Sequence, residues 1–356
     1  MADDSWRLPS IVHDLAANAP EPPSRYLIPE QDRIAGQLAG AAMPEPVPTV
    51  DLRRLLATDG AEVEAAELRS ALQTWGFFLV TSHGIETSLV DAVIAVSREF
   101  FRQPMEQKQE YSNLTEGKRW QQEGYGNDPV KTQDQVLDWS DRLHLTVEPE
   151  DARNLARWPK HPESFRDLLH EYTLKCKGVK DGILGAIAKL LGLDEDCLIN
   201  EVGDKGATYA RFNFYPACPR PDLVLGMTPH SDVRVLTLLL MEKDVGGLQV
   251  LRDGTWYNVP PVRDHALLIN MGVLMEIMTN GIFKGPVHRV VTNSEKERIS
   301  VAMFFCTDLE KEIEPLSELI DEKHPARYKK IKYRDLVAAH YEYFSKRERV
   351  IESLKI

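Results

Sequence analysis

The sequence predicts an α+β fold, in which a helical N-terminal part supports a double-stranded β-helix, or jelly roll, that is followed by a C-terminal helix. Two patterns lead to this prediction. Before residue 200, apolar residues recur at helical spacing in several segments, whereas after residue 205 many short strands alternate with tight turns. Such a series of short strands is typical of a sandwich or barrel. The hydrophobic content of 43% is ample for a buried core.

The first half of the chain is predicted to alternate helices with strands. Residues 1–47 are rich in proline and lack periodicity, so we expect a short packed segment and a connector there. Gly76 and Pro104 mark the ends of two amphipathic helices, and Pro162 suits the first turn of the longest helix. Residues 111–129 show little regular pattern and are predicted to form a loop. The expected elements are a strand at 48–52, a helix at 62–75, a strand at 77–80, a helix at 89–101, a strand at 135–145 and a helix at 162–191.

The second half of the chain is predicted to form the jelly roll. Arg252-Asp-Gly254, between two of its strands, is a typical hairpin sequence. The expected strands are 208–215, 223–227, 235–240, 247–251, 256–259, 267–270, 288–291 and 299–306, and the C-terminal helix is expected at 336–354. We divide the chain into an N-terminal extension, an N-terminal region, a supporting helix region, the jelly-roll core and a C-terminal helical segment, at 1–47, 48–160, 161–204, 205–310 and 311–356.

The composition argues against several classes of protein. A net charge of −12 argues against nucleic-acid binding, which normally needs a basic patch, and against attraction to anionic membranes. The four cysteines form no CxxC motif, which favours reduced thiols in the cytoplasm over a disulfide framework. No signal peptide is apparent, and the richest apolar run, 182–193, is too short to span a bilayer. We expect a monomeric cytoplasmic protein.

Three residues in the second half form a candidate metal site. His230 and Asp232 stand two apart, so in an extended strand both side chains point to the same face. His288 lies far enough along the chain for several strands and a return. Two imidazoles and one carboxylate leave three positions of an octahedron open, which is the arrangement in oxygen-activating Fe(II) enzymes. We therefore interpret the three as catalytic ligands of Fe(II), with ordinary surface or core roles as the alternative.

Arg298 and Ser300 follow the last of these ligands and form a candidate anchor for an acidic co-substrate. A guanidinium is a planar fork that matches a carboxylate through two hydrogen bonds, so arginine suits this role better than lysine. The Ser300 hydroxyl would provide one more hydrogen bond. The alternative is that both are ordinary polar residues of a solvated strand.

These residues resemble the plant 2-oxoglutarate/Fe(II)-dependent dioxygenase family, which also includes oxidases that dispense with 2-oxoglutarate. The family resemblance runs from about Pro46 to the C-terminus. The stretches "MADDSWRLPSIV", "LDWSDRLHL", "WPKHPESFRD" and "ESLKI" are similar to a cereal subgroup that hydroxylates triketone herbicides. The resemblance implies hydroxylation of a small organic molecule by O2, with 2-oxoglutarate converted to succinate and CO2. Fe(II), 2-oxoglutarate and O2 are then required, and ascorbate is expected to support the reaction.

The resemblance also implies roles for individual residues. Asn213 and Tyr215 of "RFNFYP" match an Asn-x-Tyr motif whose tyrosine hydrogen-bonds the co-substrate, and Arg298 and Ser300 match the pair that clamps the far carboxylate of 2-oxoglutarate. Phe304 resembles the family's substrate-stacking aromatic residue, with core packing as the alternative. Weaker candidates for substrate contact, each with a structural role as the alternative, are Trp139, Arg142, His144 and Tyr125.

Three positions depart from the common pattern of the family. Val233-Arg234-Val235 follows the H-x-D motif, where small residues are common. If the strand continues, Arg234 points to the metal face and can pair with an anionic substrate such as an enolate; the alternative is that it turns outward. Val273 stands where relatives commonly have aspartate, and Gly285 stands where serine is common. These changes bear on substrate choice more than on catalysis.

Two other functions remain open from the sequence. One is an oxidase that uses the same iron site without 2-oxoglutarate, with Arg298 and Ser300 holding a substrate carboxylate. The other is a catalytically silent jelly roll that binds a hormone-like ligand. Succinate release separates the first alternative from the dioxygenase, and iron content with turnover separates the second.

Overall fold

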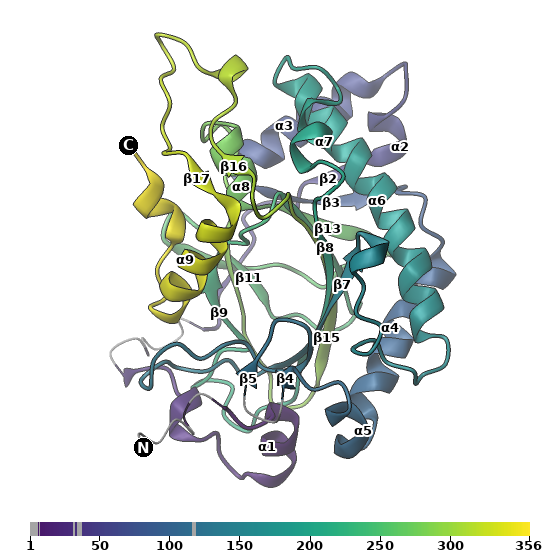
Figure 1. The fold of residues 1–356 in the computed structure, drawn as a ribbon, viewed down its shortest axis with the longest axis vertical. Coiled ribbons are helices and arrows are strands. Elements are labelled where there is room, and N and C mark those ends of the chain that lie inside the picture. The colour runs from purple at the N-terminus through teal and green to yellow at the C-terminus, as the bar shows by residue number, and fades with distance from the viewer. Residues whose placement is uncertain (1–5, 7, 31–32, 34–37, 116–118) are drawn as a thin grey trace.

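Two β-sheets face each other, and strands from both halves of the chain contribute to each of them (Figure 1). The computed structural model describes residues 6, 8–30, 33, 38–115 and 119–356. The larger sheet contains, in spatial order, β2 (Thr49–Asp51), β3 (Phe77–Thr81), β13 (Leu267–Met271), β10 (Leu236–Met241), β15 (Arg298–Phe305), β8 (Thr208–Tyr215), β7 (Asp141–Glu148) and β6 (Gly124–Gly126). The smaller sheet contains β1 (Ala41–Ala42), β12 (Thr255–Asn258), β11 (Leu248–Arg252), β14 (Val287–Val290) and β9 (Met227–His230).

Helices cover the outer face of the larger sheet, and another helix lies beside the smaller one (Figure 1). On the larger sheet, α4 (Thr87–Arg102) packs against α6 (Phe165–Leu190), and both bury residues at helical spacing. Beside the smaller sheet, α9 (Tyr333–Ser345) contacts β9. No helix in the described ranges has the length and apolar content needed to cross a membrane.

The remaining elements, apart from the 14-residue helix α3, are short. The α-helices are α1 (Val12–Asn18), α2 (Leu52–Leu55), α3 (Ala61–Thr74), α5 (Met105–Gln109), α7 (Cys197–Val202) and α8 (Val273–Met278). The 3-10 helices are η2 (Ser24–Tyr26), η4 (Glu150–Ala152), η5 (Ser317–Leu319) and η6 (Val350–Leu354). Two further strand pairs are β4 (Leu114–Thr115) with β5 (Arg119–Trp120), and β16 (Glu312–Ile313) with β17 (Ile331–Lys332).

The central strands are buried on both faces, so each contributes to two apolar cores. In β13, Leu267 and Ile269 join the core under the helices, whereas Leu268 joins a second core between the two sheets. In β15, Ile299 and Val301 face the helices in the same way. Because side chains alternate along a strand, the even-numbered residues of β15 face the space between the sheets.

The predicted α+β jelly-roll class is confirmed, but several element boundaries differ from the predictions. The strand expected at 223–227 is displaced to β9, because the Leu223 N–H turns back to the Arg220 carbonyl. The strand expected at 135–145 begins only at β7, because the Leu137 and Trp139 N–H groups bond to carbonyls of Arg25 and Leu225 instead of to a neighbouring strand.

Three further predictions differ from the structure. The helix expected at 336–354 ends at Ser345, since Arg347 adopts a φ of +60°, a left-handed conformation that commonly ends helices. The loop expected at 111–129 contains β4, β5 and β6, which are too short to show a sequence pattern. The strand does not continue through Arg234, because the N–H groups of Gly272, Val273 and Leu274 bond to carbonyls of residues 235, 232 and 234.

The N-terminal segment is tied to the core by a buried carboxylate. Asp141 of β7 is fully buried, and its two oxygens accept hydrogen bonds of 2.8 Å from the backbone N–H groups of Val12 and His13. These are N–H groups at the start of α1 that no residue within the helix can bond. The packed N-terminal segment expected from the sequence is therefore α1, held at its first turn.

We expect the Asp141→Asn variant to be less stable, because an amide replaces one of the two accepting oxygens with a donor. The free energy of unfolding should fall by about 1–3 kcal/mol, the usual effect of leaving buried polar groups unpaired. Urea unfolding measures this change, and proteolysis should cut before residue 20 more readily. Asp134→Asn, at an exposed site of the same region, is the matched control and should change stability by less than about 0.5 kcal/mol. Equal stability of the two variants would contradict the prediction.

Candidate metal centre and active site

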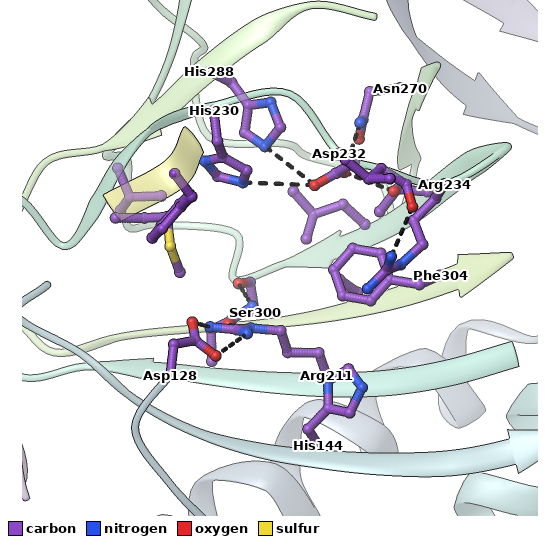
Figure 2. A pocket seen from close by; sticks show the side chains of 18 of the residues that line it. Asp128, His144, Arg211, His230, Asp232, Arg234, Asn270, His288, Ser300 and Phe304 are labelled. Carbon is purple, nitrogen blue, oxygen red and sulfur yellow. Dashed lines mark hydrogen bonds and ion pairs between the residues drawn. The ribbon is translucent and has the colours of Figure 1, made fainter. Parts of the chain in front are cut away.

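A cavity of about 110 Å³ opens between the two sheets, at the side covered by α9. Its walls come from β7–β11, β13–β15, α9 and the segment after β9. Figure 2 shows the side chains that point into it, with His230, Asp232 and His288 at one end and Asp128, Arg211 and Ser300 at the other. The residues predicted to bind metal and co-substrate thus share one cavity.

His230, Asp232 and His288 converge on one point. Cross-strand pairing of β14 with β9 sets His288 directly opposite His230, and Asp232 follows the end of β9. Asp232 Oδ1 lies 3.5 Å from His230 Nε2 and 3.9 Å from His288 Nε2, and the three donor atoms lie within 4.8 Å of one another. Within the described ranges, these residues form the one group of histidine, cysteine and carboxylate side chains arranged to hold a metal ion. Their number and type fit Fe(II) with open coordination positions.

Each donor is turned towards the shared point by a second contact. His230 Nδ1 lies 2.8 Å from the Thr228 carbonyl oxygen, and His288 Nδ1 lies 3.3 Å from the Pro286 carbonyl oxygen. An Nδ1–H that donates to a carbonyl leaves Nε2 free as a metal ligand. Burial lowers the pKa of His288 to about 4, so its imidazole is in the neutral form that binds metals.

Asp232 is oriented through its other oxygen. Asp232 Oδ2 accepts hydrogen bonds from Thr237 Oγ1 at 2.7 Å and from Asn270 Nδ2 at 2.9 Å (Figure 2), which leaves Oδ1 facing the histidines. Burial alone would raise the pKa of Asp232, but His230 and His288 hold it well below its usual range. The sequence analysis missed Thr237 and Asn270, since single polar residues in apolar strands carry no spacing signal.

Arg298 and Ser300 lie on β15, and their alternation with Ile299 turns both towards the cavity. Arg298 is only 3% exposed, yet its Nε and Nη1 atoms have no hydrogen-bond partner among the described residues. Burial also lowers the pKa of Arg298. Unpaired, buried N–H groups on a cation are costly, so this site fits an incoming carboxylate such as that of 2-oxoglutarate.

Asn213 and Tyr215 stand directly opposite these two residues on β8. The strand register pairs Arg298 with Tyr215 and Ser300 with Asn213. Asn213 Nδ2 donates to Ser300 Oγ at 3.3 Å, and the Arg298 guanidinium lies 5.2 Å from the centre of the Tyr215 ring. The four residues predicted to bind the co-substrate are therefore brought together as two cross-strand pairs.

An ion-pair network that the sequence analysis missed holds the Asn213 side chain in place. Arg211 donates to both oxygens of Asp128, at 2.8 and 2.7 Å, and its Nε donates to Asn213 Oδ1 at 2.7 Å. Arg142 Nε also donates to Asp128, at 3.2 Å. Burial alone would raise the pKa of Asp128, but the two guanidinium groups hold it well below its usual range. Arg142 thus acts on this site through Asp128 and does not line the larger cavity itself.

The other predicted substrate contacts divide into two groups. Phe304, His144 and Arg234 line the cavity, with the His144 and Phe304 ring centres 6.3 Å apart. Trp139 and Tyr125 do not line it. Trp139 packs edge-on against Tyr26, in a small apolar core that also contains Val12 of α1. Tyr125 is 1% exposed and packs against phenylalanines 100 and 101. Aromatic residues suit cores and pockets equally, so the sequence could not separate the two cases.

One wall of the cavity comes from α9, which the sequence analysis assigned no role in the site. Val337, His340, Tyr341 and Phe344 line the cavity from this helix. Phe344 stands edge-on to the His230 ring, with ring centres 5.7 Å apart. The spacing of these four residues is that of one helix face, but the spacing alone does not show what that face contacts.

The two remaining departures from the family pattern lie beside the metal ligands. Val273 is 1% exposed, and its N–H bonds to the Asp232 carbonyl at 2.8 Å. A Cβ on Gly285 would lie 3.3 Å from the Met271 carbonyl oxygen, closer than most side chains allow. Gly285 thus permits a close approach of its segment to the end of β13.

The chain is similar to known proteins along most of its length. Residues 206–307 match the model of the 2OG-Fe(II) oxygenase superfamily, and residues 47–161 match the model described as non-haem dioxygenase in morphine synthesis N-terminal. Codeine O-demethylase of Papaver somniferum is 35% identical over 93% of this chain and 91% of that protein. Jasmonate-induced oxygenase 2 of Arabidopsis thaliana is 36% identical over 91% of this chain and 87% of that protein. The crystal structure of JOX2 in complex with 2OG, Fe and JA has a TM-score of 0.86 and 32% identity, covering 99% of both chains.

These similarities extend over both sheets and over the helices around them. The solved relative holds 2OG and Fe, and this chain has matching chemistry in one cavity, with three metal donors near a buried, unpaired guanidinium. The findings favour the 2-oxoglutarate-dependent enzyme over the oxidase and the silent binding protein. Sequence, fold and site agree, and the chain belongs to the 2OG-Fe(II) oxygenase superfamily as a 2-oxoglutarate-dependent dioxygenase that uses Fe(II) and acts on a small molecule.

Proposed function

We propose that this dioxygenase hydroxylates a cyclic, anionic small molecule of the β-triketone type, either a plant metabolite or a herbicide, and releases succinate and CO2. The observation that carries the proposal is the position of Arg234. It lines the cavity on the same side as the metal ligands, and Figure 2 shows it between Asp232 and Phe304. The similarity of several stretches to the triketone-hydroxylating cereal subgroup supports the choice of substrate class.

The guanidinium of Arg234 is held in a fixed position. Its Nη1 donates to the Val233 carbonyl at 2.6 Å and to the Tyr333 hydroxyl at 3.2 Å. Its Cζ atom lies 5.2 Å from the centre of the Phe304 ring and 5.9 Å from that of Tyr209. Nε is buried and has no hydrogen-bond partner among the described residues. A cation fixed in this way, with a donor to spare, favours an anionic partner in the cavity.

The charges of the cavity support the same conclusion. Asp128 and Asp232 are the carboxylates among its described lining residues. Asp128 is shared by Arg211 and Arg142, and Asp232 belongs to the metal cluster. Arg298 is expected to pair with 2-oxoglutarate, so Arg234 keeps an uncompensated positive charge. A substrate anion would compensate it, and a cationic substrate would be repelled.

The walls suit a flat ring. Phe304, Tyr341 and Phe344 line the cavity beside Arg234, and aromatic side chains favour ring-bearing ligands through stacked and edge contacts. Relatives named for codeine and for a flavonoid act on small organic molecules of this general kind. The position of the ring relative to Arg234 would decide which carbon is presented for oxidation.

The chain's contribution to the reaction is mainly positional. Bound iron, 2-oxoglutarate and O2 together supply the oxidation of a C–H bond, chemistry that the side chains cannot perform. Arg298 and Ser300 hold the far carboxylate of the co-substrate, and Arg234 holds the substrate anion. The side chains of α9 cover the cavity and limit the entry of water. Holding the reacting groups in one geometry lowers the barrier by removing their freedom of movement.

Succinate release tests this proposal. Purified, iron-loaded protein is incubated in air with 2-oxoglutarate and with triketones, flavonoids, phenolic acids or terpenoid acids in turn. We expect triketones to stimulate succinate release and to yield a product heavier by one oxygen atom. Stimulation by neutral flavonoids alone would overturn the assigned substrate class.

Arg234→Ala should specifically weaken the use of an anionic substrate. Because a charge-assisted hydrogen bond is lost, kcat/KM for the triketone should fall about tenfold to a hundredfold. The KM for 2-oxoglutarate should stay constant, since Arg298 is unaltered. Arg234→Lys is the matched control, since it keeps the charge and should recover part of the loss. If Arg234→Ala and the parent enzyme used the triketone equally well, this residue would not bind the substrate.

We further propose that the protein works as a monomer in the cytoplasm and that ascorbate supports its turnover. Its four cysteines are free, three of them buried, as is common for proteins of reducing compartments. Light scattering after size-exclusion chromatography tests the monomer.

The ranges of the two family matches also support the division of the chain at residues 48–160 and 205–310.

A further inference from the structure

A second, much smaller cavity lies between the two sheets, next to the metal cluster. Its volume is about 20 Å³. Leu239, Leu248, Asn270 and His288 line both this cavity and the larger one, so these side chains form the partition between them. His288, whose Nε2 faces the metal site, therefore also borders the small cavity.

The wall of the small cavity is otherwise apolar and lies deep in the core. Phe77, Val250, Val259 and Leu268 are each no more than 3% exposed, and all four belong to the core between the sheets. They come from β3, β11, the residue after β12, and β13. The lining of the cavity thus comes from both sheets.

The polar groups of this wall are already engaged. The Asn270 amide donates to Asp232 Oδ2, and His288 Nδ1 contacts the Pro286 carbonyl. A buried water needs two to four polar partners and roughly 10–15 Å³ of space, and apolar cavities without such partners stay dry and accept apolar guests. The small cavity is large enough for one small molecule and offers a water little to bond with.

We propose that this cavity is a binding site for O2. The enzyme consumes one apolar diatomic molecule, and that molecule must reach the metal site when 2-oxoglutarate and substrate fill the larger cavity under α9. The small cavity provides a position for O2 on the other side of the partition, against the metal ligand His288 itself. The inference rests on the dioxygenase activity and not on the proposed substrate class.

Xenon and a cavity-filling variant test this assignment. Xenon is an apolar monatomic probe, and crystals of the protein pressurised with xenon should show an anomalous peak in the small cavity. Val259→Ile adds one methylene to the wall and replaces neither a metal ligand nor a residue that the two cavities share. It should exclude the xenon and raise the KM for O2 by at least about threefold, with iron content and the KM for 2-oxoglutarate unchanged.

Val47→Ile is the matched control. Val47 belongs to the same core between the sheets but lines neither cavity, so this variant should keep both the xenon peak and the KM for O2. O2 uptake is measured with 2-oxoglutarate alone, so the result does not depend on finding the substrate. A parent crystal without xenon in the cavity would overturn the assignment. Exclusion of xenon by Val259→Ile with an unchanged KM for O2 would overturn it too, and would identify the cavity as a packing defect.

Discussion

The His288→Ala protein is expected to fold, to lose its iron and to release almost no succinate. Removal of one of three ligands leaves His230 and Asp232, which cannot fix the metal in an open octahedral arrangement. Loss of a contact that merely orients a ligand already costs metal sites about ten- to a hundredfold in affinity, so loss of the ligand itself should cost more. Without the metal's contribution of several kcal/mol, turnover should fall at least about a thousandfold.

Metal content and activity are measured on the same preparations. His144→Ala is the matched control, because His144 lines the cavity but lies outside the metal cluster. It should retain iron at the parental level. A His288→Ala protein that still binds iron and converts 2-oxoglutarate would show that the assigned ligands are not the working set.

Arg298→Gln should have the second largest effect, on the use of 2-oxoglutarate. The parental guanidinium is buried, and its Nε and Nη1 atoms face no protein acceptor among the described residues. Each charge-assisted hydrogen bond to a carboxylate is worth about 1.5–3 kcal/mol, so the loss of two should raise the KM for 2-oxoglutarate at least about a hundredfold.

Arg298→Lys separates charge from shape. A lysine restores the positive charge but not the planar fork, so its KM for 2-oxoglutarate should lie between those of the parent and Arg298→Gln. Substrate affinity should be similar in all three proteins. If all three had the same KM for 2-oxoglutarate, the co-substrate would be anchored elsewhere in the cavity.

The residues that the sequence identified share a strict local period. Arg298, Ser300 and Phe304 alternate with apolar residues along one long strand, and a period of two fixes which side chains share a face. His230 and Asp232 also stand two apart, and they converge even though the strand ends between them. In these cases local spacing was sufficient to predict which side chains share a face, because the chain is extended through most of each motif.

The residues that the sequence analysis missed depend on long-range contacts. Nothing within residues 333–345 indicates that this helix lies beside β9, so its cavity-lining face could not be assigned. The path of the chain at Arg234 depends on Gly272, where a Cβ would lie 1.8 Å from the Arg234 carbonyl oxygen. That close approach lets the start of α8 bond the segment and end the strand. Arg234 still faces the cavity, but from an irregular segment and not from the predicted strand.

One wall of the cavity belongs to a different part of the chain from the metal and co-substrate sites. Metal donors and co-substrate anchors stand on or next to paired strands, whereas Val337, His340, Tyr341 and Phe344 stand on a single helix that contributes to neither. Substitutions on that helix can therefore change the accepted compounds without replacing a metal ligand or a co-substrate anchor. A library confined to these four positions is the natural starting point for engineering new substrate selectivity. Natural substitutions at the same positions are also a route by which related enzymes can evolve different substrates.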